Sequence, residues 1–381
     1  MSLSENDENS QLVRGLYKPD QGGAAPPELP ASMANGQFNG KQTMDELAIG
    51  KEIALILEDE KYHPVIVFGT IGAGKTTLLA SLLAGNYATG EATSFDVSLA
   101  DHALFPTGHP QVAKIRNEAV EFFEGRVRNH VDGQLQASTR FEYPFYIPIE
   151  LTPTNAQLDP ARFAFLECQG EFFNPQLVTS LNDARSYLLR KELPGFIAGV
   201  LLHYTKPMSL IHVAPCALNG RTLEQQRNAD LALLHGLANY QQRRDPSGLS
   251  REDNHLFLLS MWDEHTNGIA AESFVRPDVS HIEEILVTRF KESWGKFKAM
   301  RTGRPGRSHT FMQYSAGPVS GDGIARVPHE AHRILNRYPR TVLNWLYGNA
   351  KGHVLFPDVL EQPPSRKTLL DHVLQFAGLR L

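Results

Sequence analysis

Eight consecutive residues, Gly69-Thr70-Ile71-Gly72-Ala73-Gly74-Lys75-Thr76, have the types and spacing to bind the phosphate groups of a nucleotide. Glycine at three of these positions allows the backbone to wrap closely and to turn its N–H groups toward anionic oxygens. Lys75 supplies a cation for the β- and γ-phosphates, and the Thr76 hydroxyl is a suitable ligand for Mg²⁺. Every fixed position of the pattern G-x-x-x-x-G-K-[ST] is filled, which predicts a nucleoside triphosphate site over residues 69–77, Thr77 included. The alternative is a glycine-rich turn that precedes a helix by chance.

The residues on both sides of this turn have the context that the pattern requires. Residues 65–68, Val-Ile-Val-Phe, form a short β-branched run typical of a buried strand, and residues 75–83 are rich in the helix formers Leu and Ala. A strand, a glycine turn and a helix therefore follow one another, and the positive end of the helix dipole is directed at the turn.

The rest of the chain alternates apolar strands with helices, which predicts a three-layer α/β domain with a mainly parallel sheet. In such a domain the site lies at the carboxyl ends of the strands. Two strands are expected at 145–151 and 162–167, with a polar turn between them; the resemblance described below implies that they form an antiparallel hairpin. The further expected strands are 210–214, 255–260 and 310–315, and the expected helices are 44–58, 111–127, 175–191, 223–244, 282–300 and 340–346.

Three polar segments follow expected strands in a fixed order: Glu167-Cys168-Gln169-Gly170-Glu171, then Ser260-Met261-Trp262-Asp263, then Tyr314-Ser315-Ala316-Gly317. Together with the glycine turn, this order resembles the TRAFAC-type P-loop GTPases, the group that contains the Ras-like switches. The resemblance covers about residues 60–350 and implies a Ras-like P-loop NTPase fold. Within this group the chain most resembles the bacterial double-GTPase proteins. The grounds are the turn at 167–171, the missing lysine at 261 and the helix at 340–346.

The first of these segments corresponds to the D-x-x-G motif of that group, with Glu167 in the place of Asp. The resemblance implies that Glu167 holds Mg²⁺ through a water molecule and that Gly170 lies at the γ-phosphate. Glu171 stands where Ras-like proteins carry the glutamine that orients the attacking water, and a glutamate there can accept a hydrogen bond or a proton from it. The alternatives are an ordinary turn after a strand and a solvated charge.

The other two segments correspond to the loops that read the guanine base. Ser260-Met261-Trp262-Asp263 corresponds to the motif [NT]-K-x-D, with Met261 in the place of the lysine. The resemblance implies that Asp263 accepts hydrogen bonds from guanine N1–H and the 2-amino group. Ser315 and Ala316 correspond to the loop whose backbone N–H groups reach guanine O6. Thr93 is the expected switch hydroxyl for Mg²⁺ and the γ-phosphate. An acidic loop that merely follows a strand is the alternative at Asp263.

These residues lead to three hypotheses of function. The first is a Mg²⁺-dependent GTP-binding and hydrolysing molecular switch, with Lys75 and Glu171 as the catalytic residues. The second is an ATPase with the same phosphate loop, which the missing lysine leaves open. The third is a nucleotide-binding scaffold with little hydrolysis. Membership of the double-GTPase group would imply a protein partner in a multi-component bacterial system.

Composition narrows the class of protein. The chain has 381 residues and a formal net charge of -5, which does not favour a general nucleic-acid contact through phosphate neutralisation. Only two cysteines are present, so there is no disulfide framework. The sequence contains no apolar stretch of about 20 residues and its first residues lack a secretion signal, which predicts a cytoplasmic protein without a membrane span.

The sequence also predicts how the chain is divided. Residues 1–42 are rich in Asn, Gln, Gly, Pro and Ser and are expected to be a disordered tail. A P-loop GTPase-like domain is expected over 43–350, with an irregular insertion at about 90–143 after the first helix of the fold. Residues 351–381 are expected to form a helical extension, since their apolar residues have amphipathic spacing.

Overall fold

The computed structural model describes residues 40–70, 72–84, 95–99, 121, 124–130, 145–153, 158–167, 193, 195–216, 223–262, 279–302, 309–316, 319–320, 323–324 and 337–352. The chain divides into two units, Met1–Gln42 and Thr43–Leu381, and all the described residues except 40–42 belong to the second. Most of the predicted tail and of the predicted C-terminal extension therefore lies outside the described residues.

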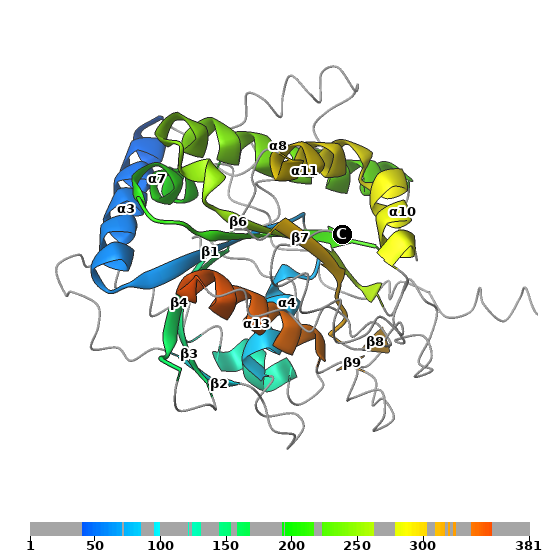
Figure 1. Cartoon of the computed structure of the whole chain (residues 1–381), viewed down its shortest axis with the longest axis horizontal. Helices are drawn as coiled ribbons and strands as arrows, with labels where there is room; N and C mark the ends of the chain where they lie inside the picture. The colour runs from blue at the N-terminus through cyan, green and yellow to red at the C-terminus, as the bar shows by residue number, and fades with distance from the viewer. Residues whose placement is uncertain are drawn as a thin grey trace, which may run out of the picture. The chain divides into compact units, whose positions relative to one another are not determined.

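Seven strands form one mostly parallel sheet in the order β2-β3-β4-β1-β5-β6-β7 (Figure 1). β4, β1, β5, β6 and β7 are parallel to one another, whereas β3 is antiparallel to both β2 and β4. The strands are β1 (Tyr62–Phe68), β2 (Phe95–Leu99), β3 (Phe145–Pro153), β4 (Ala161–Glu167), β5 (Ser209–Pro215), β6 (Asn254–Ser260) and β7 (His309–Gln313); β8 (Val319–Ser320) and β9 (Gly323–Ile324) form a separate antiparallel pair.

Helices cover both faces of the sheet, which gives the α/β architecture that the sequence predicts (Figure 1). α4 and α13 pack on one face, and α3, α7, α8, α10 and α11 pack on the other. Their bounds are α3 (Gly40–Asp59), α4 (Lys75–Ala84), α7 (Gly195–His203), α8 (Leu223–Arg244), α10 (Val279–Arg289), α11 (Lys291–Thr302) and α13 (Arg337–Lys351), with short 3₁₀ turns at Asp245–Ser247 and Leu249–Arg251. Within the described ranges, no helix is long and apolar enough to cross a membrane.

The alternation of side chains along the strands explains these two cores. In β1, Val65 and Val67 point into the core with α4 and α13, while Ile66 and Phe68 point into the opposite core. All seven residues of β1 are buried, as are all seven of β5 and of β6. A strand covered on both faces needs a continuous apolar run rather than an alternating one, which is the pattern of these segments.

The connections of the sheet favour the end of β1 as the place for a ligand. β1 lies between β4 and β5, and the chain leaves β1 through α4 on one face but leaves β5 through α8 on the other. Adjacent parallel strands whose connections depart to opposite faces leave room for a ligand at their carboxyl ends. The glycine turn that follows β1 lies at this place.

Most of the predicted elements are confirmed. The helix predicted at 223–244 has those bounds in α8, and the predicted hairpin is the antiparallel pair of β3 and β4. The strand predicted at 65–68 begins three residues earlier, at Tyr62, and the strand predicted to run to residue 315 ends at Gln313. The helix predicted at 175–191 lies outside the described residues.

Two predictions of the sequence are wrong. The insertion after α4 is not irregular throughout, because Phe95–Leu99 forms β2 and extends the sheet beside β3. The single helix predicted at 282–300 is two helices that meet at Phe290. The break has a physical cause: Asp230 on α8 accepts hydrogen bonds from the backbone N–H groups of Glu292 (3.0 Å) and Ser293 (2.8 Å) and so caps the start of α11.

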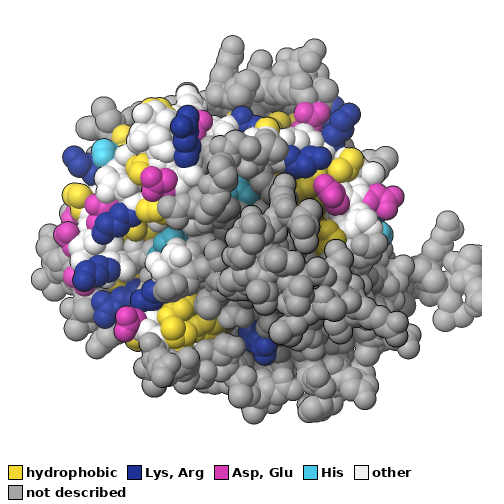
Figure 2. All heavy atoms as spheres, viewed as in Figure 1, with side chains coloured by type: hydrophobic (Ala, Val, Ile, Leu, Met, Phe, Trp, Pro, Cys, Tyr) yellow, Lys and Arg dark blue, Asp and Glu magenta, His cyan; other side chains and the backbone are white. Residues whose placement is uncertain are grey.

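Charged side chains of both signs occur together on the surface. In the described part of the face shown in Figure 2, Lys and Arg side chains are interspersed with Asp and Glu. This mixture agrees with the small net charge of the chain.

Candidate functional site

A tight turn joins β1 to α4, and its glycines are needed for its geometry. Gly72 and Gly74 have φ of 67° and 86°, a left-handed conformation that costs a residue with a side chain about 1–2 kcal/mol. Gly69 packs directly against β5, where a methyl group on it would lie 2.9 Å from Val213 O. Glycine is therefore required both for the curvature of the turn and for its contact with the neighbouring strand.

The side chain of Lys75 folds back onto the carbonyl groups at the start of this turn. Its ammonium group donates hydrogen bonds to Gly69 O (3.0 Å) and Thr70 O (3.2 Å), and its side chain is only 6% exposed. Thr70 O also accepts a hydrogen bond from Ala73 N (3.2 Å). Within the described residues both acceptors are neutral carbonyl oxygens, so these contacts use two of the three ammonium protons without neutralising the charge. A buried cation held in this way is suited to meet an anion.

The first turn of α4 faces the same place. Leu78 N donates a hydrogen bond to Gly74 O (2.8 Å) at the start of this helix, and the N–H groups of a first helical turn point toward its amino end. Thr76 and Thr77 lie half-buried on this first turn. An anion over the turn would meet the Lys75 ammonium group, the backbone N–H groups and the positive end of the helix dipole together.

Ser260, the last residue of β6, connects the turn to the predicted base-reading loop. Its hydroxyl donates a hydrogen bond to Ala73 O (2.6 Å), and its own carbonyl accepts hydrogen bonds from Cys216 N (3.0 Å) and Cys216 Sγ (2.9 Å). The sequence assigned roles only to the second and fourth residues of Ser260-Met261-Trp262-Asp263. The signal that would have identified Ser260 is a hydroxyl at the first position of that motif.

Met261 lies beside the turn in an unusual backbone conformation. Its φ is 58°, in the left-handed region that non-glycine residues rarely adopt. A methyl group placed on Gly74 would lie 4.0 Å from Met261 Cε, so the thioether end is close to the turn. Trp262 N then donates a hydrogen bond to Tyr314 O (3.2 Å), which connects this segment to the one that follows β7.

The segment after β7 is also connected to α4. The Tyr314 hydroxyl forms a short hydrogen bond with the Ser81 hydroxyl of α4, and burial raises the pKa of Tyr314 well above its ordinary value although the bond to Ser81 acts in the opposite direction. Ser315 is 1% exposed, and Ala316 is half-buried and packs against the core under α4 and α13. Both residues predicted to reach the base therefore lie at the same edge of the sheet as the glycine turn.

Glu167 is the last residue of β4. Its backbone lies opposite Val67 of β1 in the parallel register, two residues before the turn begins at Gly69. The structure describes only the backbone of Glu167. The remaining predicted site residues, namely Ile71, Thr93, Gly170, Glu171 and Asp263, lie outside the described residues. Within the described ranges, no group of three or more His, Cys, Asp and Glu side chains could hold a metal ion.

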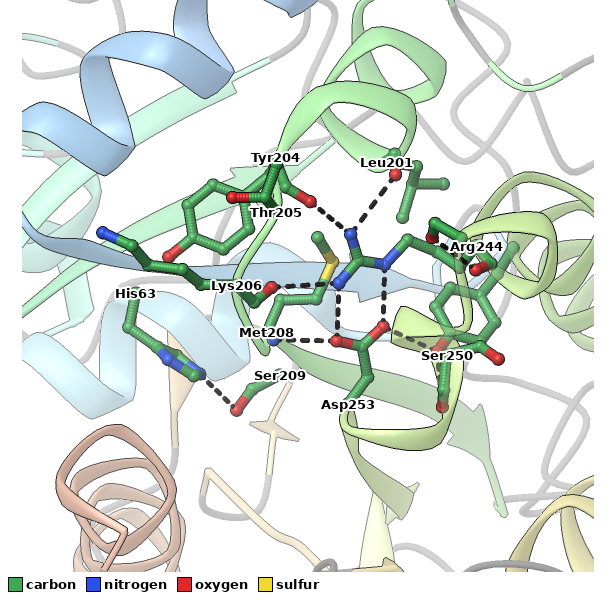
Figure 3. A network of polar contacts seen from close by, with 12 residues as sticks. His63, Leu201, Tyr204, Thr205, Lys206, Met208, Ser209, Arg244, Ser250 and Asp253 are labelled. Atoms are coloured by element: carbon green, nitrogen blue, oxygen red, sulfur yellow. Dashed lines mark hydrogen bonds and ion pairs between the residues drawn. The ribbon is translucent and has the colours of Figure 1, made fainter.

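A second polar network lies at the opposite, amino-terminal edge of the sheet (Figure 3). Arg244 at the end of α8 binds Asp253 through two hydrogen bonds, from Nε (2.9 Å) and Nη2 (2.8 Å), and both side chains are fully buried. Arg244 also donates hydrogen bonds to the carbonyl oxygens of Leu201 (3.5 Å), Tyr204 and Lys206 (3.0 Å). These contacts join the end of α7 and the end of α8 to the segment before β6, which makes the network an anchor of the fold.

No protein-family model matches the chain, and a search of curated proteins finds no match either.

Proposed function

We propose that the chain binds a Mg²⁺–nucleoside triphosphate at residues 69–77 and hydrolyses its β–γ phosphoanhydride, with GTP as the substrate. The observation that carries the proposal is the buried Lys75 ammonium group, held by two carbonyl oxygens inside a glycine turn at the carboxyl end of the central strand β1. An anion with several oxygens would replace these neutral partners of the ammonium group with negatively charged ones, which adds attraction between opposite charges.

The arrangement of the other segments supports a Ras-like P-loop protein. The resemblance requires an antiparallel hairpin after the first helix of the fold and two further strands that each end in a loop at the site. β3 and β4 form such a hairpin, and β6 and β7 are parallel to β1. Hydrogen bonds from Ser260 to Ala73 and from Trp262 to Tyr314 bring the segments after β6 and β7 to the glycine turn.

The residues near the turn fit a magnesium ion as ligands. Mg²⁺ prefers oxygen donors and retains several water molecules, so it needs few protein ligands. Thr76 offers a hydroxyl on the first turn of α4, and Glu167 ends β4 opposite Val67 of β1. In this proposal Thr76 binds the ion directly, Glu167 holds it through a water molecule, and Thr93 adds the switch hydroxyl. The bound ion would neutralise charge on the β- and γ-phosphate oxygens.

Each remaining residue then has a distinct role. Lys75 moves from the loop carbonyls to the β- and γ-phosphates and stabilises the charge that develops between them. Glu171 orients the attacking water and accepts a hydrogen bond from it. Asp263, Ser315 and Ala316 recognise guanine. When the γ-phosphate leaves, the segments around Thr93 and Gly170 lose a contact and relax, which is the basis of a switch.

Two other functions keep the same phosphate site. An ATPase without guanine specificity is favoured by Met261, because an apolar side chain in the lysine position removes a charge near the base. Competition between labelled GTP and unlabelled ATP separates the two, and equal displacement by ATP would reject the role of Asp263. A scaffold with little hydrolysis is tested by turnover of the wild type and Glu171→Ala; equal nonzero rates would remove Glu171 from the mechanism.

Calorimetry with Mg²⁺–GTP and Mg²⁺–ATP tests the proposal directly. We expect saturable binding by the wild type and a loss of roughly 10²-fold or more in affinity for Lys75→Ala, because a charged partner of the phosphates is removed. Lys51→Ala on the exposed side of α3 is the matched control and should bind as the wild type does. Absence of binding in the wild type, or equal binding by Lys75→Ala, would reject a phosphate site at this turn.

A further inference from the structure

The carbonyl of Ala73 is held on the outside of the glycine turn. It accepts a hydrogen bond of 2.6 Å from the hydroxyl of Ser260, which is 4% exposed and therefore shielded from water. Serine at the end of a strand has three staggered positions for its hydroxyl, and this contact selects one of them. The bond joins residues that are 187 positions apart in the sequence.

The direction of this carbonyl determines the direction of the next N–H group. In a trans peptide the C=O of one residue and the N–H of the following residue lie in one plane and point in opposite directions. Because the Ala73 carbonyl points out toward β6, the Gly74 N–H points away from β6. Gly74 has a φ of 86°, and glycine restricts the rotation of its peptide less than any other residue, so the contact with Ser260 limits a plane that is otherwise free to turn.

Ser260 is in turn held by the neighbouring strand. Its carbonyl accepts hydrogen bonds from both the backbone N–H and the thiol of Cys216, which directly follows β5 and is fully buried. The carbonyl of Cys216 accepts a hydrogen bond from the guanidinium group of Arg289 on α10. A continuous chain of hydrogen bonds therefore runs from α10 through the ends of β5 and β6 to the glycine turn.

From these contacts we infer that Ser260 is a positioning residue for the phosphate-binding turn and that Cys216 holds Ser260 in place. By fixing the Ala73–Gly74 peptide, Ser260 keeps the Gly74 N–H directed at the site of the phosphates before any ligand arrives. The ligand then does not have to order this peptide itself, and preorganisation of that kind appears as affinity. The inference rests on the proposed function and adds to it a residue that contacts neither phosphate nor base.

The test compares two buried serines that each form a side-chain hydrogen bond. Ser260→Ala removes the contact with Ala73, whereas Ser209→Ala removes contacts with His63 Nε2 (2.8 Å) and Asn349 Nδ2 (3.4 Å) at the opposite edge of the sheet. The affinity for Mg²⁺–GTP is measured by calorimetry and the stability by thermal unfolding for both variants. We expect Ser260→Ala to lose roughly tenfold in affinity and Ser209→Ala less than about twofold, with similar losses of stability.

Two further variants complete the design. Ser260→Thr retains the hydroxyl and should restore the affinity to within about threefold of the wild type. Cys216→Ala removes the thiol bond but keeps the backbone bond, so it should weaken binding by a smaller factor, about two- to threefold. Cys216→Ala also provides the decisive result if Ser260→Ala does not fold, since an affinity equal to that of the wild type would then overturn the inference.

The outcomes separate this inference from the proposed function. Suppose that the wild type binds Mg²⁺–GTP. If Ser260→Ala then binds equally well, or if Ser209→Ala weakens binding as much as Ser260→Ala does, Ser260 has no positioning role. The proposed nucleotide site is unaffected by either result. If the wild type binds neither Mg²⁺–GTP nor Mg²⁺–ATP, the proposed function is rejected and this inference with it.

Discussion

Acidification from about pH 7.5 to about pH 5 is expected to destabilise the protein through two buried imidazoles. Burial lowers the pKa of His63 to about 4, and burial with a smaller contribution from His309 lowers the pKa of His212 to about 3. His212 is stacked between Phe68, at 5.4 Å, and His255, at 5.5 Å between ring centroids. Both groups are therefore neutral in the folded protein, while in the unfolded chain they take up a proton near pH 6.5.

The sign and the size of the effect follow from this difference. Below pH 6.5 the unfolded chain binds more protons than the folded protein, so the free energy of unfolding falls as the pH falls. This continues until the pH reaches the folded pKa values of about 4 for His63 and about 3 for His212. Each pH unit in this window costs about 1.4 kcal/mol per histidine, so at about pH 5 each histidine has removed about 2 kcal/mol and the pair about 4 kcal/mol.

Urea unfolding at several pH values measures this loss. His212→Gln and His63→Gln keep a polar side chain but cannot take up a proton, so each should reduce the loss between about pH 7.5 and about pH 5 by about 2 kcal/mol. His281→Gln, at an exposed position on α10, controls for the change from histidine to glutamine itself. A pH slope that neither His63→Gln nor His212→Gln changes would refute the reasoning.

Three substitutions test other parts of the fold by unfolding measurements or hydrogen exchange. Asp253→Asn leaves the fully buried guanidinium group of Arg244 without its charged partner and should cost about 3–5 kcal/mol in urea unfolding; a cost below about 1 kcal/mol would contradict a buried ion pair. Asp230→Ala removes the cap of α11 and should cost about 1–2 kcal/mol, with faster amide exchange in the first turn of that helix; unchanged exchange there would contradict the capping role. Gly199→Ala places a methyl group 2.5 Å from Leu47 O between α7 and α3 and should lower the stability by about 1–3 kcal/mol, whereas a neutral result would mean that the two helices can separate at little cost.

The sequence was sufficient for the elements whose signal is local. The β-branched run of β1 and the glycine turn that follows it have the backbone geometry that their residue types require. α8 was located to the residue, because a long stretch of helix formers lies between two breaks in the pattern. β2 was missed although it has a local signal, since its buried Phe95 and Val97 alternate with the exposed Asp96 and Ser98 with a period of two.

Other features depend on residues that are distant in the sequence. The break between α10 and α11 is fixed by Asp230, which lies 62 positions before Glu292, and the residues around the break have no turn signal of their own. Likewise, nothing local indicates that Arg244 at the end of a helix becomes fully buried, since arginines at helix ends are usually solvated. Such contacts are decided by packing between elements, and a single sequence does not contain the positions of those elements.

The candidate site shows how one motif can lose a charge and keep its geometry. The loop proposed to read the base has Met261 where the resemblance predicts lysine, and the side chain nevertheless lies beside Gly74. The connection between this loop and the phosphate turn depends on the hydroxyl of Ser260 and on backbone groups, none of which carries a net charge. The described contacts that hold the glycine turn therefore include none that needs a charge at residue 261. We therefore expect that the missing lysine weakens recognition of the base. The affinity for the triphosphate should change little, because it depends on Lys75 and on the peptide that Ser260 holds.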